Sequence, residues 1–145
     1  MKISAHVVNQ EGDHSAVLTT DGQEQSLQIS PKPDGFGSSV NGGELLFLAL
    51  ATCYCNDLYR EARRRGIRID RVEVEVTGEF SGEGSAADNI SYRASVDAKA
   101  PREQILDLMR HTDSVAEIQN TLRRSSPVIL SHCDAHEVSG TISPP

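Results

Sequence analysis

Apolar and polar residues alternate along the first thirty positions of the chain, a pattern typical of half-buried β-strands. Three alternating segments, 2–7, 14–20 and 23–30, therefore predict three strands. Asp21-Gly22 lies between the second and third segments and favours a tight hairpin, because such a turn requires positive φ angles. The segment that follows, 31–39, contains proline and glycine residues that interrupt any regular pattern, so we expect a loop.

The next element is a long helix, predicted over 43–65 and ended by Gly66. Asn41 and Glu44 are spaced as a capping box, in which each side chain bonds the other residue's backbone N–H. The first half, 45–53, is apolar on nearly all sides, which is typical of a helix buried on all sides, for example in a dimer. The basic residues of the second half are interpreted as a solvated face: Arg60, Arg63, Arg64 and Arg65.

The rest of the chain predicts five further elements. They are two strands, two helices and a last strand, at 69–80, 89–98, 102–111, 115–124 and 135–142. Ser114 and Glu117 are spaced as a second capping box at the start of the second short helix. The order β-β-β-α-β-β-α-α-β, without repeats or an interdomain linker, predicts one α+β domain over residues 1–145.

Composition narrows the classes of function. The 14 lysine and arginine residues stand against 21 aspartate and glutamate residues, so the net charge is −7. This balance argues against nucleic acid and against an anionic membrane surface, because both require clustered cations. The longest apolar run, 45–51, is too short to span a bilayer, and residues 1–10 lack the apolar stretch of a signal peptide. We therefore expect a cytoplasmic protein.

The cysteines are the first candidates for chemistry. Cys53, Cys55 and Cys133 form an odd, small set without a secretion signal, so they make a poor disulfide framework. Cys53 is either a small buried residue or a reactive thiol. Cys55 lies about 200° around the helix from it, so the two thiols point apart.

Glu44 is either a capping residue at the helix start or a functional carboxylate.

A short cluster near the C-terminus is the candidate metal site. His132, Asp134 and His136 would share one face of a strand, and such side chains bind metals. Their spacing fits no established metal motif, and a solvated strand end accounts for them. We therefore expect neither a metal nor another cofactor.

The central helix also carries a resemblance. Its segment 41–53, Asn-Gly-Gly-Glu-Leu-Leu-Phe-Leu-Ala-Leu-Ala-Thr-Cys, resembles the hallmark segment of the OsmC-like family, which includes osmotically inducible protein C and the organic hydroperoxide resistance proteins. The segments 66–69 and 72–78 look alike too, and 116–122 is similar to the segment that the family writes C-P-V-S-x-T-L. The resemblance covers almost the whole chain.

The resemblance implies an OsmC-like fold, an intertwined homodimer of α+β subunits with antiparallel sheets around two long central helices. It also implies a thiol peroxidase. Cys53 would attack the peroxide as a thiolate, and a second cysteine would condense with the resulting sulfenic acid. An arginine from the N-terminal half and a glutamate from the start of the central helix would position and activate the first thiol.

The chain departs from that pattern at three positions. Ala116 occupies the position of the second cysteine, and no arginine occurs before Arg60. The family's glutamate stands one position earlier, where this chain has Gly43, so Glu44 is an approximate match. The substitutes that the sequence offers are Cys55 or Cys133 as the resolving thiol and Arg93 as the cation.

Two hypotheses follow. In the first, the protein is a thiol-dependent reductase of organic hydroperoxides, with Cys53 as the peroxidatic thiol, Glu44 as a positioning group, and an external thiol or another cysteine as the resolving thiol. In the second, it is a catalytically degenerate family member, a dimeric scaffold whose interface binds a small apolar ligand.

Overall fold

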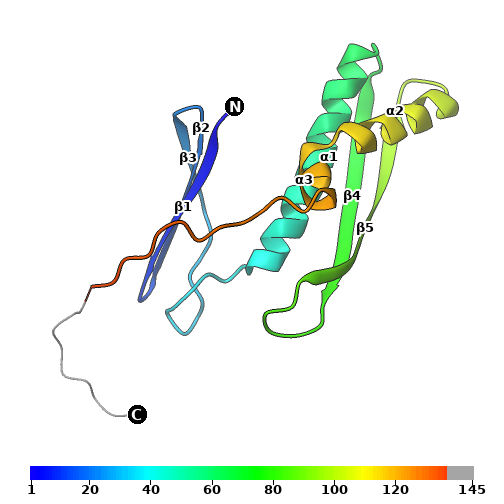
Figure 1. Cartoon of the computed structure of the whole chain (residues 1–145). Coiled ribbons are helices and arrows are strands. Elements are labelled where there is room, and N and C mark those ends of the chain that lie inside the picture. Colours follow the sequence, from blue (N-terminus) through cyan, green and yellow to red (C-terminus); the bar gives the residue numbers. More distant parts are fainter. Residues whose placement is uncertain (137–145) are drawn as a thin grey trace.

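The computed structural model describes residues 1–136 and is an α+β fold (Figure 1). Its elements are β1 Ile3–Gln10, β2 Asp13–Thr20, β3 Gln23–Leu27, α1 Gly42–Arg64, β4 Ile69–Phe80, β5 Ala87–Ala98, α2 Arg102–Val115 and α3 Glu117–Arg123. The predicted fold class is confirmed, and so is the order of elements from the first strand to the third helix.

The N-terminal strands form one antiparallel sheet in the order β1-β2-β3. Asp21 and Gly22 connect β2 to β3 with φ angles of 47° and 84°, so the predicted hairpin turn is confirmed. The backbone N–H of Lys2 donates to Asp21 Oδ1 at 2.7 Å and ties the start of β1 to this turn.

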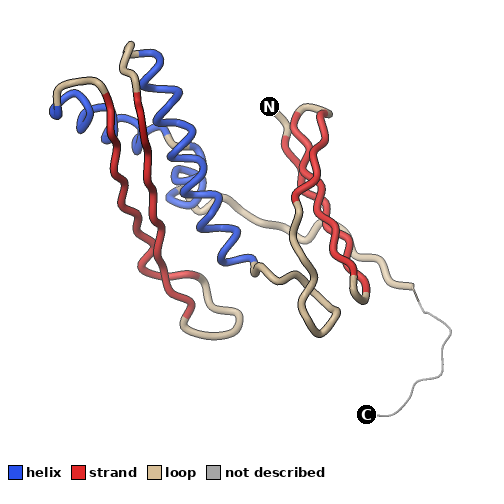
Figure 2. Tube along the Cα trace, turned by 180° about the vertical axis from the view of Figure 1, so that it is seen from behind, coloured by secondary structure: helices blue, strands red, loops and turns tan. Residues whose placement is uncertain are grey.

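The second sheet consists of β4 and β5 and forms one side of the core. Val74 is opposite Ala94, and Val76 is opposite Tyr92, so the apolar residues of both strands share one face. This face packs against α1, which lies between the two sheets (Figures 1 and 2). The fully enclosed part of the core is a cluster from α1, α2 and the α2–α3 junction: Tyr54, Leu58, Ala62, Leu108 and Ala116.

The start of α1 is held by the predicted capping box. Glu44 donates its backbone N–H to Asn41 Oδ1 at 2.9 Å, and Asn41 donates its backbone N–H to Glu44 Oε2 at 2.7 Å. The helix ends at Arg64, and Gly66 beyond it has a φ angle of 67°. Both predicted boundaries are therefore correct to within one residue.

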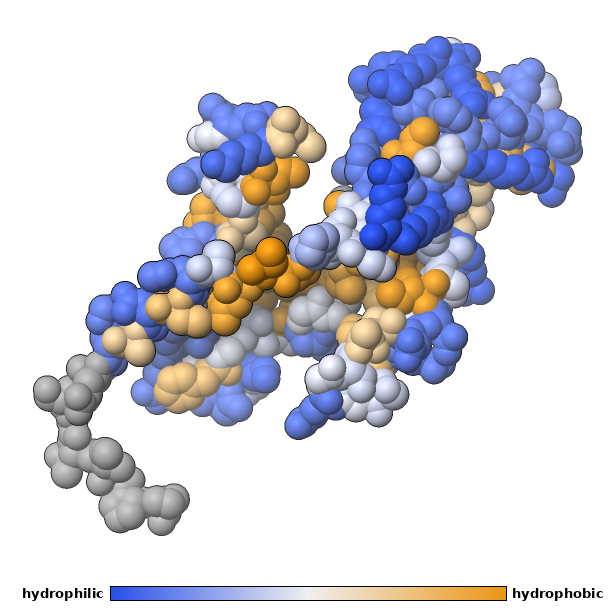
Figure 3. All heavy atoms as spheres, viewed as in Figure 1, coloured by the Kyte–Doolittle hydropathy of each residue, from blue (hydrophilic) through white to orange (hydrophobic). Residues whose placement is uncertain are grey.

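Burial along α1 differs from the prediction in both halves. In the apolar first half, Leu48 is 59% exposed, so this half is not buried on all sides within one chain. In the charged second half, Asp57 and Glu61 are only 5% and 3% exposed. Figure 3 shows hydrophobic residues gathered between the β1–β3 sheet and the helices, with hydrophilic residues around the C-terminal end of α1.

The C-terminal third corrects two predictions. α2 continues to Val115, because the hydroxyl groups of Thr112 and Ser114 donate to Leu108 O and His111 O inside the same helix. The second capping box is therefore wrong: α3 begins after Ala116, without a side-chain cap. Of the last predicted strand, residues 135 and 136 are not in a strand, and 137–142 lie outside the described residues.

Among the helices of residues 1–136, none combines the length and the apolar character needed to cross a lipid bilayer.

Candidate functional site

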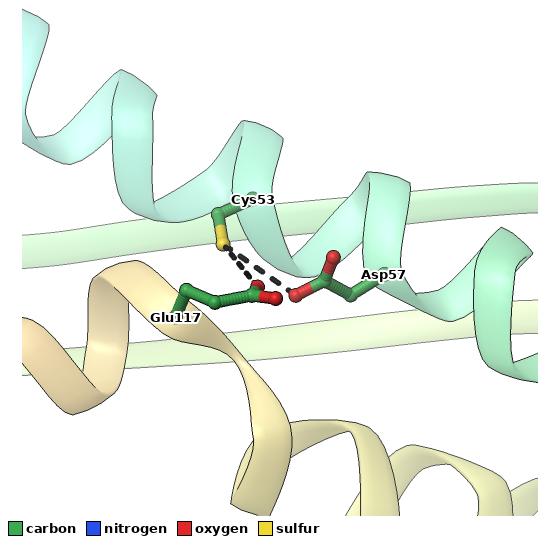
Figure 4. A group of neighbouring side chains, drawn as sticks. All are labelled: Cys53, Asp57 and Glu117. Carbon is green, nitrogen blue, oxygen red and sulfur yellow. Dashed lines mark hydrogen bonds between the residues drawn. The ribbon is translucent and has the colours of Figure 1, made fainter. Parts of the chain in front are cut away.

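The thiol of Cys53 faces two carboxylates that come from different helices (Figure 4). Its Sγ lies 3.5 Å from Asp57 Oδ2 and 3.9 Å from Glu117 Oε2. Asp57 follows Cys53 by four residues on α1, a spacing that places both on one helix face. Glu117 is the first residue of α3, and the break between α2 and α3 at Ala116 brings it against this face.

Arg60 is the cation of this site. Its Nη1 lies 2.7 Å from Asp57 Oδ1 and 3.3 Å from Glu117 Oε1, so one guanidinium joins both carboxylates. It follows Cys53 by seven residues, which is two helical turns. The interpretation of Arg60 as part of a solvated face is therefore wrong, and the spacing of Cys53, Asp57 and Arg60 was the available signal for the cluster.

The surroundings favour the protonated form of the thiol. Burial raises the pKa of the Cys53 thiol, and the negative charges of Asp57 and Glu117 raise it further. The backbone N–H of Ile118 opposes them by donating to the sulfur. This is not the electropositive environment that turns a cysteine into a thiolate near neutral pH.

The two carboxylates differ in their affinity for a proton. Burial raises the pKa of Asp57, and a hydrogen bond with Glu117 raises it further. The pKa of Glu117 is lowered, first by a hydrogen bond from its own backbone N–H at the start of α3 and then by Asp57 and Arg60. Of the two, Asp57, which lies nearer to the thiol, therefore binds a proton more readily than Glu117.

The same three side chains are spaced closely enough to surround a cation. One ligand atom from each of Cys53, Asp57 and Glu117 lies within 4.8 Å of the others. The guanidinium of Arg60 already supplies a positive charge to both carboxylates. Of the earlier metal candidates, His136 Nε2 lies 3.4 Å from Asp134 Oδ2 on an exposed C-terminal segment.

Glu44 lies at the other end of α1 and is not beside Cys53. Its carboxylate accepts the hydrogen bond of the capping box. A Cβ at Gly43, where the family's glutamate stands, would lie 2.8 Å from the ring of Phe80. A glutamate at Gly43 would therefore require Phe80 to move, which is a physical reason for this departure from the family pattern.

The substitutes named from the sequence lie elsewhere. Arg93 Nε lies 2.5 Å from Glu75 Oε2 on the outer side of β5, and its side chain is 83% exposed. Cys55 is half-buried, Cys133 is exposed on the C-terminal segment, and both thiols are free. Ala116, where the resemblance places the second cysteine, is fully buried in the core cluster, and Cys53 packs against that cluster.

The comparisons with known proteins agree with this fold. The family model described as OsmC-like protein matches residues 35–131, which include every member of the site. The chain belongs to the OsmC-like family. No match is found among curated proteins.

Solved structures of the family share the fold at low sequence identity. An OsmC-like protein from Mycoplasma pneumoniae is 22% identical with a TM-score of 0.62, over 85% of this chain and 88% of that one. An OsmC-like hydroperoxide resistance protein from a Jannaschia species is 11% identical with a TM-score of 0.53, over 87% of each chain. The OsmC-like fold is therefore established for this chain, and its function has to be argued from the site.

Proposed function

We propose that the protein is a thiol-dependent reductase of organic hydroperoxides, with Cys53 as the reacting thiol. The observation that supports this most is the position of the Cys53 thiol, 3.5 Å from the buried carboxylate of Asp57. A protonated thiol needs a base at the moment it attacks, and a buried carboxylate with a raised pKa is a better base than an exposed one. The family membership and the name of the Jannaschia protein support the same class of substrate.

The proposed first step is a displacement at oxygen. Asp57 in its ionised form takes the thiol proton while the sulfur of Cys53 attacks the terminal oxygen of the hydroperoxide. The O–O bond breaks, the alkoxide leaves with the proton that Asp57 holds, and Cys53 becomes a sulfenic acid. Sulfur is oxidised and the hydroperoxide is reduced to its alcohol, so atoms and electrons balance.

Arg60 and Glu117 keep Asp57 ready for this step. The positive charge of Arg60 lies 2.7 Å from Asp57 Oδ1 and favours its ionised form, while the hydrogen bond with Glu117 favours its protonated form. These opposed effects together set the proton affinity of Asp57, which in the proposed step has both to accept and to release a proton.

An external thiol completes the cycle. It condenses with the sulfenic acid of Cys53 to a mixed disulfide and water, and a second thiol releases Cys53 by exchange. Ala116 provides no sulfur for this step, so Cys55 and Cys133 are the remaining internal alternatives. A reducing cytoplasm would supply such thiols.

We also propose that the protein acts as a homodimer. Leu48 on α1 is 59% exposed, and Val128, Ile129 and Leu130 on the C-terminal segment are 98%, 78% and 81% exposed. Large apolar side chains of this kind normally lie in an interface. A second copy of the chain, as the family resemblance implies, would cover them.

The test measures consumption of cumene hydroperoxide with dithiothreitol as reductant. The wild-type protein is expected to turn over, and the Cys53→Ser variant is expected to be inactive. Cys133→Ser is the matched control at an exposed thiol and should retain activity. Equal rates for the wild type and Cys53→Ser would reject the proposal.

A shallow groove between β5 and α2 favours a second candidate function, the binding of a small apolar ligand. It is about 310 Å³ in volume, and its apolar lining includes Ala94, Val96, Ile105, Leu106 and Met109. If hydroperoxide is not consumed, binding of an apolar fluorescent probe that Leu106→Glu abolishes would support this candidate instead.

A further inference from the structure

Glu61 is a buried carboxylate that the proposed reaction does not use. It is 3% exposed and lies on α1 directly after Arg60. Its Oε1 accepts hydrogen bonds from Arg60 Nε at 3.0 Å and from Arg64 Nη1 at 2.8 Å, and its Oε2 lies 3.4 Å from His111 Nε2. A buried carboxylate is costly unless it is paired, so these partners explain how Glu61 is tolerated at this position.

The guanidinium of Arg60 is used on two sides at once. Its Nε donates to Glu61, while its Nη1 contacts Asp57 and Glu117 beside the thiol. Because the guanidinium is planar and rigid, a bond that fixes Nε also fixes the direction of Nη1. The side chain of Arg60 is 36% exposed, so without this anchor it could turn toward solvent.

We propose that Glu61 is a positioning residue for Cys53, which acts by holding the Arg60 guanidinium between Asp57 and Glu117. The inference deepens the proposed function, and its role in turnover rests on that function. With Arg60 in place, its positive charge offsets the two carboxylates that face the thiol. When Arg60 turns away, both negative charges face the sulfur uncompensated, and the thiolate forms less readily.

The direct effect of the Glu61 charge has the opposite sign. Glu61 follows Cys53 by eight residues, which is about 12 Å along the helix. Removing a negative charge at that distance would by itself make the thiolate slightly easier to form, and salt would screen most of the effect. A loss of Cys53 reactivity on removal of Glu61 therefore indicates the route through Arg60.

The experiment measures the pH dependence of Cys53 alkylation by iodoacetamide in a Cys55→Ser/Cys133→Ser background, where Cys53 is the only thiol. Glu61→Met removes both the charge and the hydrogen-bond acceptor, and should raise the midpoint pH and slow alkylation at pH 7.5 about threefold. Glu61→Gln removes the charge but keeps an acceptor oxygen for Arg60 Nε, and should remain near the parent. Equal shifts in the two variants, or a downward shift in Glu61→Met, would overturn the proposal.

Two variants of Arg60 test whether Glu61 acts through the Arg60 guanidinium. Arg60→Met should shift the midpoint upward, and adding Glu61→Met to it should produce no further shift, since the residue through which Glu61 acts is already gone. Arg60→Lys leaves Glu61 intact and keeps the positive charge at position 60. A lysine ammonium cannot contact Glu61 through one nitrogen and Asp57 and Glu117 through another, so this variant should also shift the midpoint upward. An additive double variant would overturn the proposal, as would an Arg60→Lys variant identical to the parent.

This readout does not depend on peroxidase activity. Alkylation shifts as expected in a protein that consumes no hydroperoxide would reject the proposed function and leave the role of Glu61 intact. Hydroperoxide turnover that is unchanged in Glu61→Met, together with unchanged alkylation, would reject the role of Glu61 alone. Circular dichroism of each variant, at a temperature where the parent is folded, ensures that only folded protein is compared.

Discussion

The two halves of α1 contrast in a way that their composition does not suggest. The first half is apolar, yet Leu48 is 59% exposed. The second half is rich in charge, yet Asp57 and Glu61 are almost fully buried. The first half therefore presents apolar surface outward, while the second half encloses polar side chains inside one chain.

The two halves of the helix therefore have different roles, one in assembly and one in the surroundings of the thiol. We interpret the exposed apolar residues of the first half as the contact surface for a second copy. α3 packs against the middle of α1, and the contact between Cys53, at the end of the first half, and Asp57, Arg60 and Glu117 is complete within one chain. The account therefore predicts that assembly and thiol environment respond to different substitutions.

The largest effect is expected from Leu48→Arg. A charge at the proposed contact between two copies should convert a dimer to a monomer at micromolar concentration in analytical ultracentrifugation, because a buried unpaired charge is very costly. Tyr59→Arg, at a 41% exposed position of the second half, is the matched control and should remain a dimer. A wild-type protein that sediments as a monomer would contradict the role of the first half as a contact between two copies.

A second substitution tests whether α3 packs on Cys53 within the same chain. Ala116 is fully buried in the core cluster that contacts Cys53. Ala116→Cys should therefore form a disulfide with Cys53 after hydroperoxide treatment, detected by peptide mass spectrometry. The disulfide should lie within one chain, so a denaturing gel without reductant should show a monomer band; a linked dimer would contradict this packing.

Asp57→Asn should lower both the stability of the fold and the pKa of the Cys53 thiol. It removes the charged partner of Arg60 at a buried position, so the free energy of unfolding should fall by roughly 1–3 kcal/mol in a urea titration. The loss of a negative charge beside the sulfur should also lower the midpoint pH of Cys53 alkylation. Asp70→Asn, which removes an exposed ion pair with Arg68, should change stability by less than about 1 kcal/mol.

At the other end of the helix, Asn41→Ala should reduce stability by about 1 kcal/mol, since it removes one side of the capping box. Glu44→Gln keeps an oxygen that can accept from Asn41 N–H, so it separates capping from catalysis. Unchanged hydroperoxide turnover in Glu44→Gln would limit Glu44 to capping. Lost turnover with normal stability would instead support its role as a positioning group across the dimer.

The smallest expected effect is a pH dependence of stability. The folded chain raises the pKa of Cys53 above its unfolded value of about 8.5, so the thiol contributes its full stabilisation below that pH. This contribution is lost as the pH rises through the folded pKa. The difference in unfolding free energy between the wild type and Cys53→Ser should therefore shrink from pH 8 to pH 10, and a constant difference would contradict the raised pKa.

Local patterns account for the parts of the fold that could be predicted. The Asp21-Gly22 turn and the Asn41–Glu44 capping box depend on neighbours within a few residues, so both are visible in the sequence. The second capping box failed because the hydroxyl of Ser114 donates to His111 O inside α2, an equally local alternative that spacing alone does not exclude.

Only part of the site could be predicted from the sequence. The spacing of Cys53, Asp57 and Arg60 places them on one helix face, but the same spacing occurs on any solvated helix. What completes the site is Glu117 of α3, and the contact between Cys53 and Glu117 joins residues 64 positions apart. Such a contact depends on how α3 packs on α1, and no periodicity of the sequence encodes it.

Trapping the sulfenic acid tests the central claim most directly, because the claim is that the surroundings formed by Asp57, Arg60 and Glu117 make Cys53 the reacting thiol. The protein is treated with one equivalent of cumene hydroperoxide in the presence of dimedone, and the adduct is located by peptide mass spectrometry. The account predicts the adduct on Cys53 in preference to the exposed Cys133. An adduct on Cys133 with Cys53 unmodified would contradict it.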